Sequence, residues 1–163
     1  MDLNFSFNRS RVDMVKWIHF KTKFEAMIAY LSGAMEFADD EGSGWRKDLT
    51  KWLDDNLGHQ VYDPVIQSAA LIKKYADFIR ICVDYDIETV RNRTDYVICL
   101  WDNNVLKGAG THAEVTLAYE SKKPVFLINK LSKTDLSGWI MACSTKIFND
   151  FNSLKPYLLD KYR

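Results

Sequence analysis

Short apolar segments alternate with longer amphipathic ones along most of the chain, and this pattern predicts strands and helices in turn. Polar or turn-forming residues bound each short segment, as expected of a buried strand. The predicted strands are Ala26 to Gly33, Gln60 to Pro64, Asp95 to Trp101, Pro124 to Asn129 and Thr145 to Phe148. The third is apolar on both faces, which is typical of a central strand in a parallel sheet.

The segments between these strands repeat apolar residues at helical spacing. In the first, Trp45, Leu49, Trp52 and Leu53 share one face, and Gly58 predicts the end of the helix. The other predicted helices are Val65 to Arg80, Asp86 to Thr94, Thr111 to Lys122, a stretch around Trp139, and Ser153 to Arg163 with Pro156 in its first turn.

Strands that alternate with helices predict a parallel sheet with helices on both faces. The expected fold is α/β and flavodoxin-like: a doubly wound five-stranded parallel sheet of order 2-1-3-4-5. In that order, a ligand binds where the first and third strands end side by side. The domain is expected to span 25–163, preceded by an N-terminal extension over 1–24 that the pattern does not place.

Composition limits the kinds of partner that the protein is expected to bind. Lys plus Arg and Asp plus Glu both number 22, so the chain lacks the basic surplus of nucleic-acid binders. We find no apolar run of membrane-spanning length, so no membrane partner is expected. Three cysteines without a C-x-x-C pair indicate reduced thiols and a cytoplasmic protein.

The segment Lys107 to Ile128 raises the main chemical question. Thr111 and Glu114 have the spacing of a capping box, in which the glutamate bonds back to the start of its helix. Gly108 and Gly110, however, let the backbone approach a ligand, and the helix N-terminus after them favours an ionised carboxylate. Glu114 is therefore either a capping group or a nucleophile at the carboxyl edge of the sheet.

Several other chemistries lack their motifs. His112 and Glu114 match half of a zinc deaminase signature, but its P-C-x-x-C partner is missing. Neither Gly33 nor Gly110 begins a Walker A loop, and the glycines after the third strand are too few for a dinucleotide fingerprint. We therefore expect no metal and no cofactor.

Four segments, in order along the chain, resemble motifs of the nucleoside 2-deoxyribosyltransferase superfamily, which includes 2'-deoxynucleoside 5'-phosphate N-hydrolases and CMP N-glycosidases. They are "AYLSGAM" from Ala29, "DYDIETVRNRTDYVICLWD" from Asp84, "GAGTHAEVTLAY" from Gly108 and "DLSGWIMA" from Asp135. The resemblance covers about residues 26–160. It implies a small-molecule nucleoside or nucleotide substrate and a homo-oligomer whose subunits share active sites.

The resemblance also implies roles for individual residues. Glu114 takes the place of the nucleophile, Asp86 that of the general acid, and Tyr30 that of a tyrosine that orients the glutamate. Asp84 competes with Asp86 for the acid role, and either aspartate also fits a helix N-cap. The implied substrate contacts are Ser32, Gly33, Arg46, Asp102, Gly108, Gly110, Thr111 and Ser137.

The chain departs from the family at Gly108, six residues before the glutamate, where transferases carry aspartate and phosphate N-hydrolases carry serine. Asp102 is a candidate to replace that contact. Ser137 matches a serine that contacts the 5'-phosphate in the N-hydrolases, and Arg46 would supply positive charge, so the sequence favours a 5'-monophosphate.

Two other functions stay open at this point. A cytokinin-activating-type phosphoribohydrolase also pairs a Gly-Thr loop with a glutamate, but its preceding P-G-G is missing here. A non-catalytic nucleotide-binding module with the same fold is the third possibility, because Gly108 lacks the usual side chain.

Overall fold

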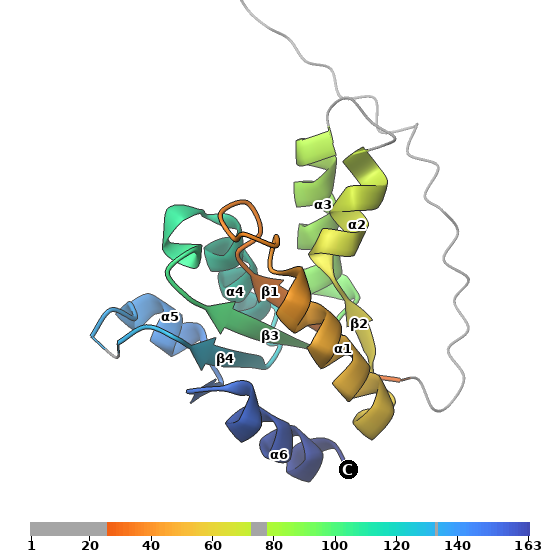
Figure 1. Ribbon diagram of the computed structural model, residues 1–163, viewed down its shortest axis with the longest axis vertical. Helices are drawn as coiled ribbons and strands as arrows, with labels where there is room; N and C mark the ends of the chain where they lie inside the picture. The colour runs from red at the N-terminus through yellow and green to blue at the C-terminus, as the bar shows by residue number, and fades with distance from the viewer. Residues whose placement is uncertain (1–25, 73–77, 133) are drawn as a thin grey trace, which may run out of the picture.

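The computed structural model describes residues 26–72, 78–132 and 134–163. Five parallel strands form one sheet: β1 (Ile28–Gly33), β2 (Gln60–Tyr62), β3 (Tyr96–Trp101), β4 (Val125–Asn129) and β5 (Lys146–Phe148). Their order is β2-β1-β3-β4-β5, which confirms the predicted flavodoxin-like sheet (Figure 1). The predicted extension over 1–24 lies outside the described residues.

Helices cover both faces of the sheet (Figure 1). They are α1 (Ser43–Leu57), α2 (Pro64–Ile72), α3 (Phe78–Asn92), α4 (Gly110–Glu120), α5 (Gly138–Cys143) and α6 (Phe151–Tyr162), with a short 3-10 turn η1 (Val105–Lys107) after β3. Buried side chains of α1 and α6 pack on one face, and those of α3, α4 and α5 pack on the other. Among the described helices, none has the length and apolar character needed to cross a bilayer.

Alternating side chains of the strands supply the two cores. In β1, Ala29 and Leu31 belong to the core beneath α1 and α6, whereas Tyr30 belongs to the core beneath α3, α4 and α5. Successive side chains of a strand point to opposite faces, so this division follows from the sequence alone. β3 lies between β1 and β4 and is apolar on both faces, as predicted for a central strand.

Two helix predictions need correction. The segments predicted as separate helices from Val65 to Arg80 and from Asp86 to Thr94 are instead divided between α2 and α3, because residues 78–92 form one continuous helix. Asp86 therefore lies in the middle of α3, and the N-cap interpretation of Asp84 and Asp86 is wrong. Pro156 lies in the second turn of α6, which begins at Phe151 rather than Ser153.

Candidate active site

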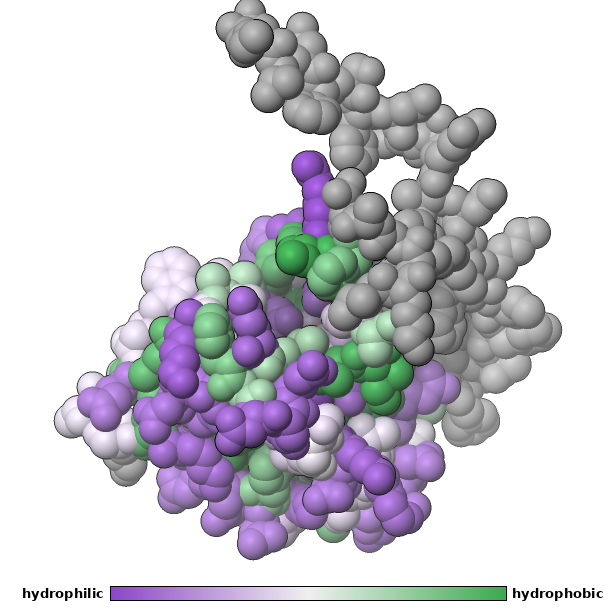
Figure 2. All heavy atoms as spheres, turned by 45° about the horizontal axis from the view of Figure 1, so that its top comes forward, coloured by the Kyte–Doolittle hydropathy of each residue, from purple (hydrophilic) through white to green (hydrophobic). Residues whose placement is uncertain are grey.

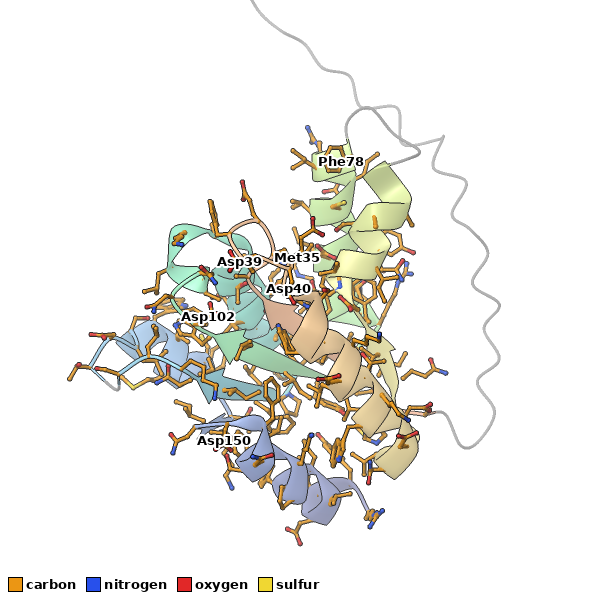
Figure 3. All side chains as sticks on the ribbon, in the orientation of Figure 1. Met35, Asp39, Asp40, Phe78, Asp102 and Asp150 are labelled. Carbon is orange, nitrogen blue, oxygen red and sulfur yellow. The ribbon has the colours of Figure 1, made fainter. Side chains whose placement is uncertain are left out.

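A cleft of about 580 Å³ opens where the carboxyl ends of β1 and β3 meet, at the predicted switch point of the sheet. Its walls come from the loop after β1, from α2 and α3, and from the segment that leads into α4. Figure 3 shows Met35 and Asp39 in the loop after β1 and Phe78 at the start of α3; all three line the cleft. Six sequence-predicted site residues also line it: Gly33, Asp86, Gly108, Gly110, Thr111 and Glu114.

The Glu114 side chain does not cap its helix, so the capping-box interpretation is wrong. The N-cap position of α4 is Ala109, which makes no side-chain capping bond, and Thr111 is buried within the first turn. The carboxylate of Glu114 instead accepts hydrogen bonds from the Tyr30 hydroxyl at 2.7 Å and the Ser32 hydroxyl at 2.5 Å. Tyr30 and Ser32 are two residues apart in β1, so both side chains point to the face that α4 covers.

Two opposing influences act on the charge of Glu114. Burial raises the pKa of Glu114, because desolvation disfavours the charged carboxylate. The hydrogen bonds from Ser32 and Tyr30 and the positive charge of Arg46 oppose this rise because they favour the ionised form, but the pKa of Glu114 remains raised on balance. Glu114 lies in the second turn of α4 rather than the first, so these hydroxyls contribute to its ionisation more directly than the helix dipole invoked from sequence.

Asp86 reaches the same cleft from α3. Its carboxylate accepts a hydrogen bond of 3.0 Å from the Tyr62 hydroxyl, and the Tyr62 ring stacks on Tyr30 with 5.1 Å between ring centroids. Burial, together with the nearby Glu114 carboxylate, raises the pKa of Asp86 to about 7. Asp84 is exposed on the same helix and does not line the cleft, so the geometry favours Asp86.

Tyr62 is a site residue that the motifs did not reveal. It ends β2 and pairs with Tyr30 in the parallel register of the sheet. The predicted strand order could have revealed Tyr62, because it pairs the second strand with the first. Tyr62 at the end of the second strand then lies beside Tyr30 in the first. Tyr30 and Tyr62 thus stack beside each other, and each donates to one of the two carboxylates.

Arg46 does not face the cleft, in contrast to the predicted phosphate contact. The side chain is fully buried, and its guanidinium donates to the carbonyl oxygens of Leu31, Gly33, Glu41 and Gly42 over 2.8 to 3.3 Å. Asp63 lies 3.6 Å from its Nε. Arg46 therefore holds the end of β1 against the start of α1 and shapes the loop between them.

The same loop requires a glycine at position 42. Gly42 has a φ of 69°, and an added Cβ would lie 2.3 Å from the Arg46 Nη1 and 2.7 Å from the Ala34 carbonyl oxygen. Asp40 closes the turn by accepting hydrogen bonds from the backbone N–H groups of Gly42 and Gly44. Arg46, Gly42 and Asp40 thus set the conformation of the loop that forms this wall of the cleft.

Two further predicted contacts have structural roles in this chain. The Asp102 carboxylate accepts from the backbone N–H groups of Asn104 at 2.9 Å and Val105 at 3.2 Å, so it orders η1 rather than replacing a side chain at Gly108. Ser137 is exposed and caps α5 by accepting from the Ile140 N–H at 3.3 Å. Ser137 does not line the cleft of its own chain.

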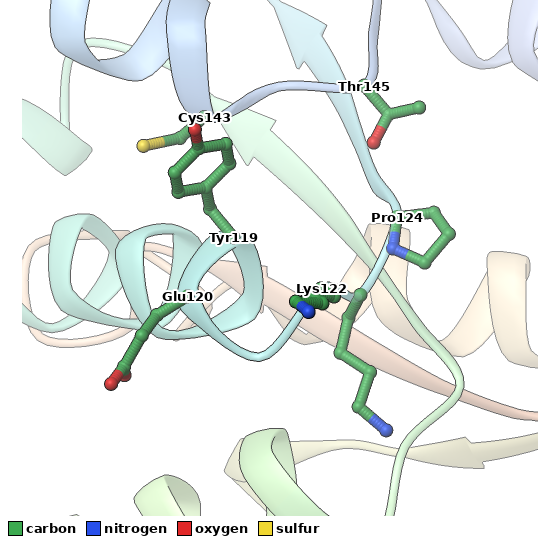
Figure 4. Close-up of a pocket in the computed structure, with 7 residues that line it drawn as sticks. Tyr119, Glu120, Lys122, Pro124, Cys143 and Thr145 are labelled. Atoms are coloured by element: carbon green, nitrogen blue, oxygen red, sulfur yellow. The ribbon is translucent and has the colours of Figure 1, made fainter.

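The described residues do not form a metal site beside the cleft, and a second hollow in the structure is separate from it. Within residues 26–72, 78–132 and 134–163, the His, Cys, Asp and Glu side chains form no group of three or more suited to a metal ion. Figure 4 shows a separate hollow where α4 leads into β4, lined by Tyr119, Lys122, Pro124, Cys143 and Thr145 among others. It contains none of the predicted site residues.

Comparison with known proteins supports the fold. No protein-family model matches the chain, and no curated protein matches it in sequence. A 2-deoxyribosyltransferase from the psychrotolerant bacterium Bacillus psychrosaccharolyticus superposes with a TM-score of 0.67 and 21% identity, over 83% of this chain and 95% of that one. The Clostridium botulinum CMP N-glycosidase BcmB gives a TM-score of 0.55 and 20% identity, over 83% of this chain and 99% of that one. The chain thus shares the fold of these two proteins.

Proposed function

We propose that this protein cleaves the N-glycosidic bond of a nucleoside or nucleoside 5'-monophosphate, with Glu114 as the nucleophile. The observation that carries the proposal is the pairing of two carboxyl groups in one cleft. Two hydroxyl donors favour the ionised form of Glu114, and the pKa of Asp86 is raised to about 7, so that Asp86 keeps a proton near neutral pH. Glycosidic cleavage requires a nucleophile that reacts as the carboxylate and an acid that holds a proton. The two hydroxyl donors oppose the effect of burial on Glu114, and Asp86 would supply the proton.

In the first step, a Glu114 carboxylate oxygen attacks the anomeric carbon of the sugar. The carbon–nitrogen bond breaks, its electron pair leaves with the base, and the Asp86 carboxyl proton moves to that base. The product is a glycosyl ester on Glu114 and an ionised Asp86. In the second step, Asp86 takes a proton from water or from the N–H of a second base, which attacks the same carbon and releases Glu114.

The neighbouring side chains are assigned supporting roles. Tyr30 and Ser32 fix the two oxygens of Glu114, and Tyr62 fixes Asp86, so the carboxyl groups need little reorganisation during the reaction. Gly33, Gly108, Gly110 and Thr111 line the cleft and remain the proposed substrate contacts. Because Ser32 is fully buried and donates to Glu114, we assign it to positioning the nucleophile rather than to the substrate.

The direct test is incubation of the purified protein with a panel of nucleosides and 5'-monophosphates, with and without a second base, followed by chromatography of the free base. Release of base alone indicates hydrolysis, and a new nucleoside indicates transfer. A phosphoribohydrolase would release base only from ribonucleoside 5'-monophosphates, and a non-catalytic module would release none. A 2-fluoro-substituted substrate should slow the second step and leave the sugar on a peptide containing Glu114, detectable by mass spectrometry.

We further propose a closed homo-oligomer in which α5 of one subunit lies near the cleft of another. Ser137 begins α5 on the surface, and the Trp139 side chain beside it is 68% exposed. Large exposed aromatic side chains of this kind are typical of protein interfaces. Light scattering at micromolar concentration should show a dimer or larger species, and a fully active monomer would contradict the arrangement.

A further inference from the structure

We propose that the cleft selects an uncharged nucleoside with a free 5'-hydroxyl and rejects the corresponding 5'-monophosphate. This inference rests on the proposed glycosidic activity and names its substrate class. It reverses the preference that Arg46 and Ser137 predicted from sequence.

The charge of the cleft is the first observation. Among its described lining residues five are acidic, and none is Lys, Arg or His. The acidic residues are Glu36, Asp39, Glu41, Asp86 and Glu114. Two belong to the proposed chemistry, whereas Glu36, Asp39 and Glu41 are exposed on the loop after β1. A 5'-phosphate carries up to two negative charges, so all three loop carboxylates would repel it.

The second observation concerns Arg46, the cation that the sequence predicted as a contact of the 5'-phosphate. Arg46 is fully buried beneath the loop, and its N–H donors are directed at four backbone carbonyl oxygens. Turning the guanidinium toward the cleft would break these bonds and leave the carbonyl groups without partners, which is costly in a buried position. Ser137 lies outside the cleft of its own chain. In the proposed oligomer a neighbouring subunit would bring Ser137 and α5 near the cleft, but neither Ser137 nor any residue of α5 is Lys, Arg or His.

The third observation is the apolar character of the remaining wall. At Gly108, an added Cβ would lie 3.4 Å from the Phe37 ring, which is itself 40% exposed beside the cleft. Ile79 and Val83 add exposed apolar surface from α3. On the upper side of the molecule, Figure 2 shows green hydrophobic and purple hydrophilic side chains interleaved. The side chains of Ser68, Asn104 and Thr111 also line the cleft and can donate to a phosphate, but they are uncharged. The backbone N–H groups at the start of α4 add a partial charge of about +0.5, which is small against three carboxylates.

The test compares kcat/KM for a nucleoside and its 5'-monophosphate at two ionic strengths. At 0.01 M we expect the nucleoside to be favoured by about tenfold or more, because long-range repulsion acts over a Debye length of about 30 Å. At 1 M the screening length falls to about 3 Å, so the preference should shrink several-fold. A preference that does not change with salt would assign the selection to shape and overturn the electrostatic proposal.

A variant without the three loop charges tests whether these carboxylates cause the preference for the nucleoside. The triple substitution Glu36→Gln, Asp39→Asn and Glu41→Gln should raise kcat/KM for the monophosphate about tenfold at low salt, with little change for the nucleoside. A matched control changes the same number of charges on the opposite face of the sheet: Asp48→Asn and Asp54→Asn in α1 with Asp160→Asn in α6, all exposed. The control should leave the ratio unchanged.

The possible failures are distinguishable. A 5'-monophosphate cleaved as fast as its nucleoside would overturn this inference and leave the glycosidic activity in place. If no substrate releases base, the proposed function fails, and equilibrium dialysis with adenosine and its 5'-monophosphate still decides the selectivity. Equal binding of the two, or binding of neither, would then overturn it.

Discussion

The two faces of the sheet are built from the same strands but do different work. Beneath α1 and α6, the core contains residues such as Leu31, Leu53 and Leu158, and its stability comes from apolar burial. Beneath α3 and α4, the same kind of core includes Tyr30. The Tyr30 hydroxyl donates to the carboxylate of Glu114, and burial raises the pKa of that carboxylate. Both faces thus contribute apolar burial, and the face beneath α3 and α4 also holds the hydroxyl and carboxyl groups of the proposed site.

The largest effect should come from removing the nucleophile. We expect Glu114→Gln to lower kcat by about a thousandfold or more, because the glycosyl ester can no longer form. The variant should stay folded, since a neutral amide is less costly to bury than a carboxylate. Circular dichroism and base release measure the two properties. Turnover by this variant at the wild-type rate would end the mechanism.

The matched change on the other face is Leu158→Ala. It should cost about 2 to 5 kcal/mol of unfolding free energy, because Leu158 is fully buried and truncation leaves a cavity. The fraction that remains folded should keep its kcat. If Leu158→Ala changes kcat as strongly as Glu114→Gln, the division of labour between the two faces does not hold.

The next effect concerns the acid. Asp86→Asn should lower kcat by about a hundredfold or more for ordinary nucleosides, since no proton reaches the leaving base. A nucleoside of an N7-methylated purine already carries positive charge on its base, so the base can leave without a proton. For such a substrate, Asp86→Asn should lower kcat far less. In the wild type, kcat should fall as pH rises through about 7, where Asp86 loses its proton, and this limb should vanish in Asp86→Asn. An equal loss for both kinds of substrate would remove Asp86 from the acid role.

A smaller effect is expected from the residues that position Glu114. Tyr30→Phe and Ser32→Ala each remove one hydroxyl donor from the carboxylate, and each should lower kcat about tenfold with little change in KM. Without a donor, the pKa of Glu114 should rise, so the acidic limb of the pH–rate profile should move to higher pH. Tyr96→Phe is a control, because its hydroxyl bonds His59 rather than Glu114. An unmoved acidic limb would contradict the positioning role.

Sequence reasoning predicted the sheet order and the place of Glu114, because both follow from local patterns. The patterns failed where partners lie far apart along the chain. Thr111 and Glu114 fit a capping box locally, but the Glu114 partner Tyr30 is 84 residues away. The sequence offers Arg46 as the positive charge for a phosphate, and only the fold shows that it is buried among carbonyl groups. The Tyr62–Asp86 contact joins a three-residue strand to the middle of a helix, and no spacing rule encodes it.

The smallest expected effect is a pH-dependent difference in stability between two aspartates on one helix. Folding raises the pKa of Asp86 from 3.8 to about 7, so the native state favours its protonated form. This contribution is fully present below about pH 4 and is lost as pH rises through about 7. Asn cannot ionise, so Asp86→Asn should gain on the wild type as pH rises. At about 1.4 kcal/mol per pKa unit, the full shift corresponds to about 4 kcal/mol. Because Asp86 is only partly buried and solvent screens its charge, the gain at pH 8 should reach roughly 1 to 3 kcal/mol.

The control is Asp84→Asn, which makes the same substitution at an exposed position of α3. Denaturant unfolding at pH 4.5 and pH 8 measures both variants against the wild type. Asp84→Asn should stay within about 0.5 kcal/mol of the wild type at both values. If the Asp86→Asn difference is the same at the two pH values, Asp86 is not held protonated by the fold. The acid in the proposed mechanism would then have to come from elsewhere in the cleft.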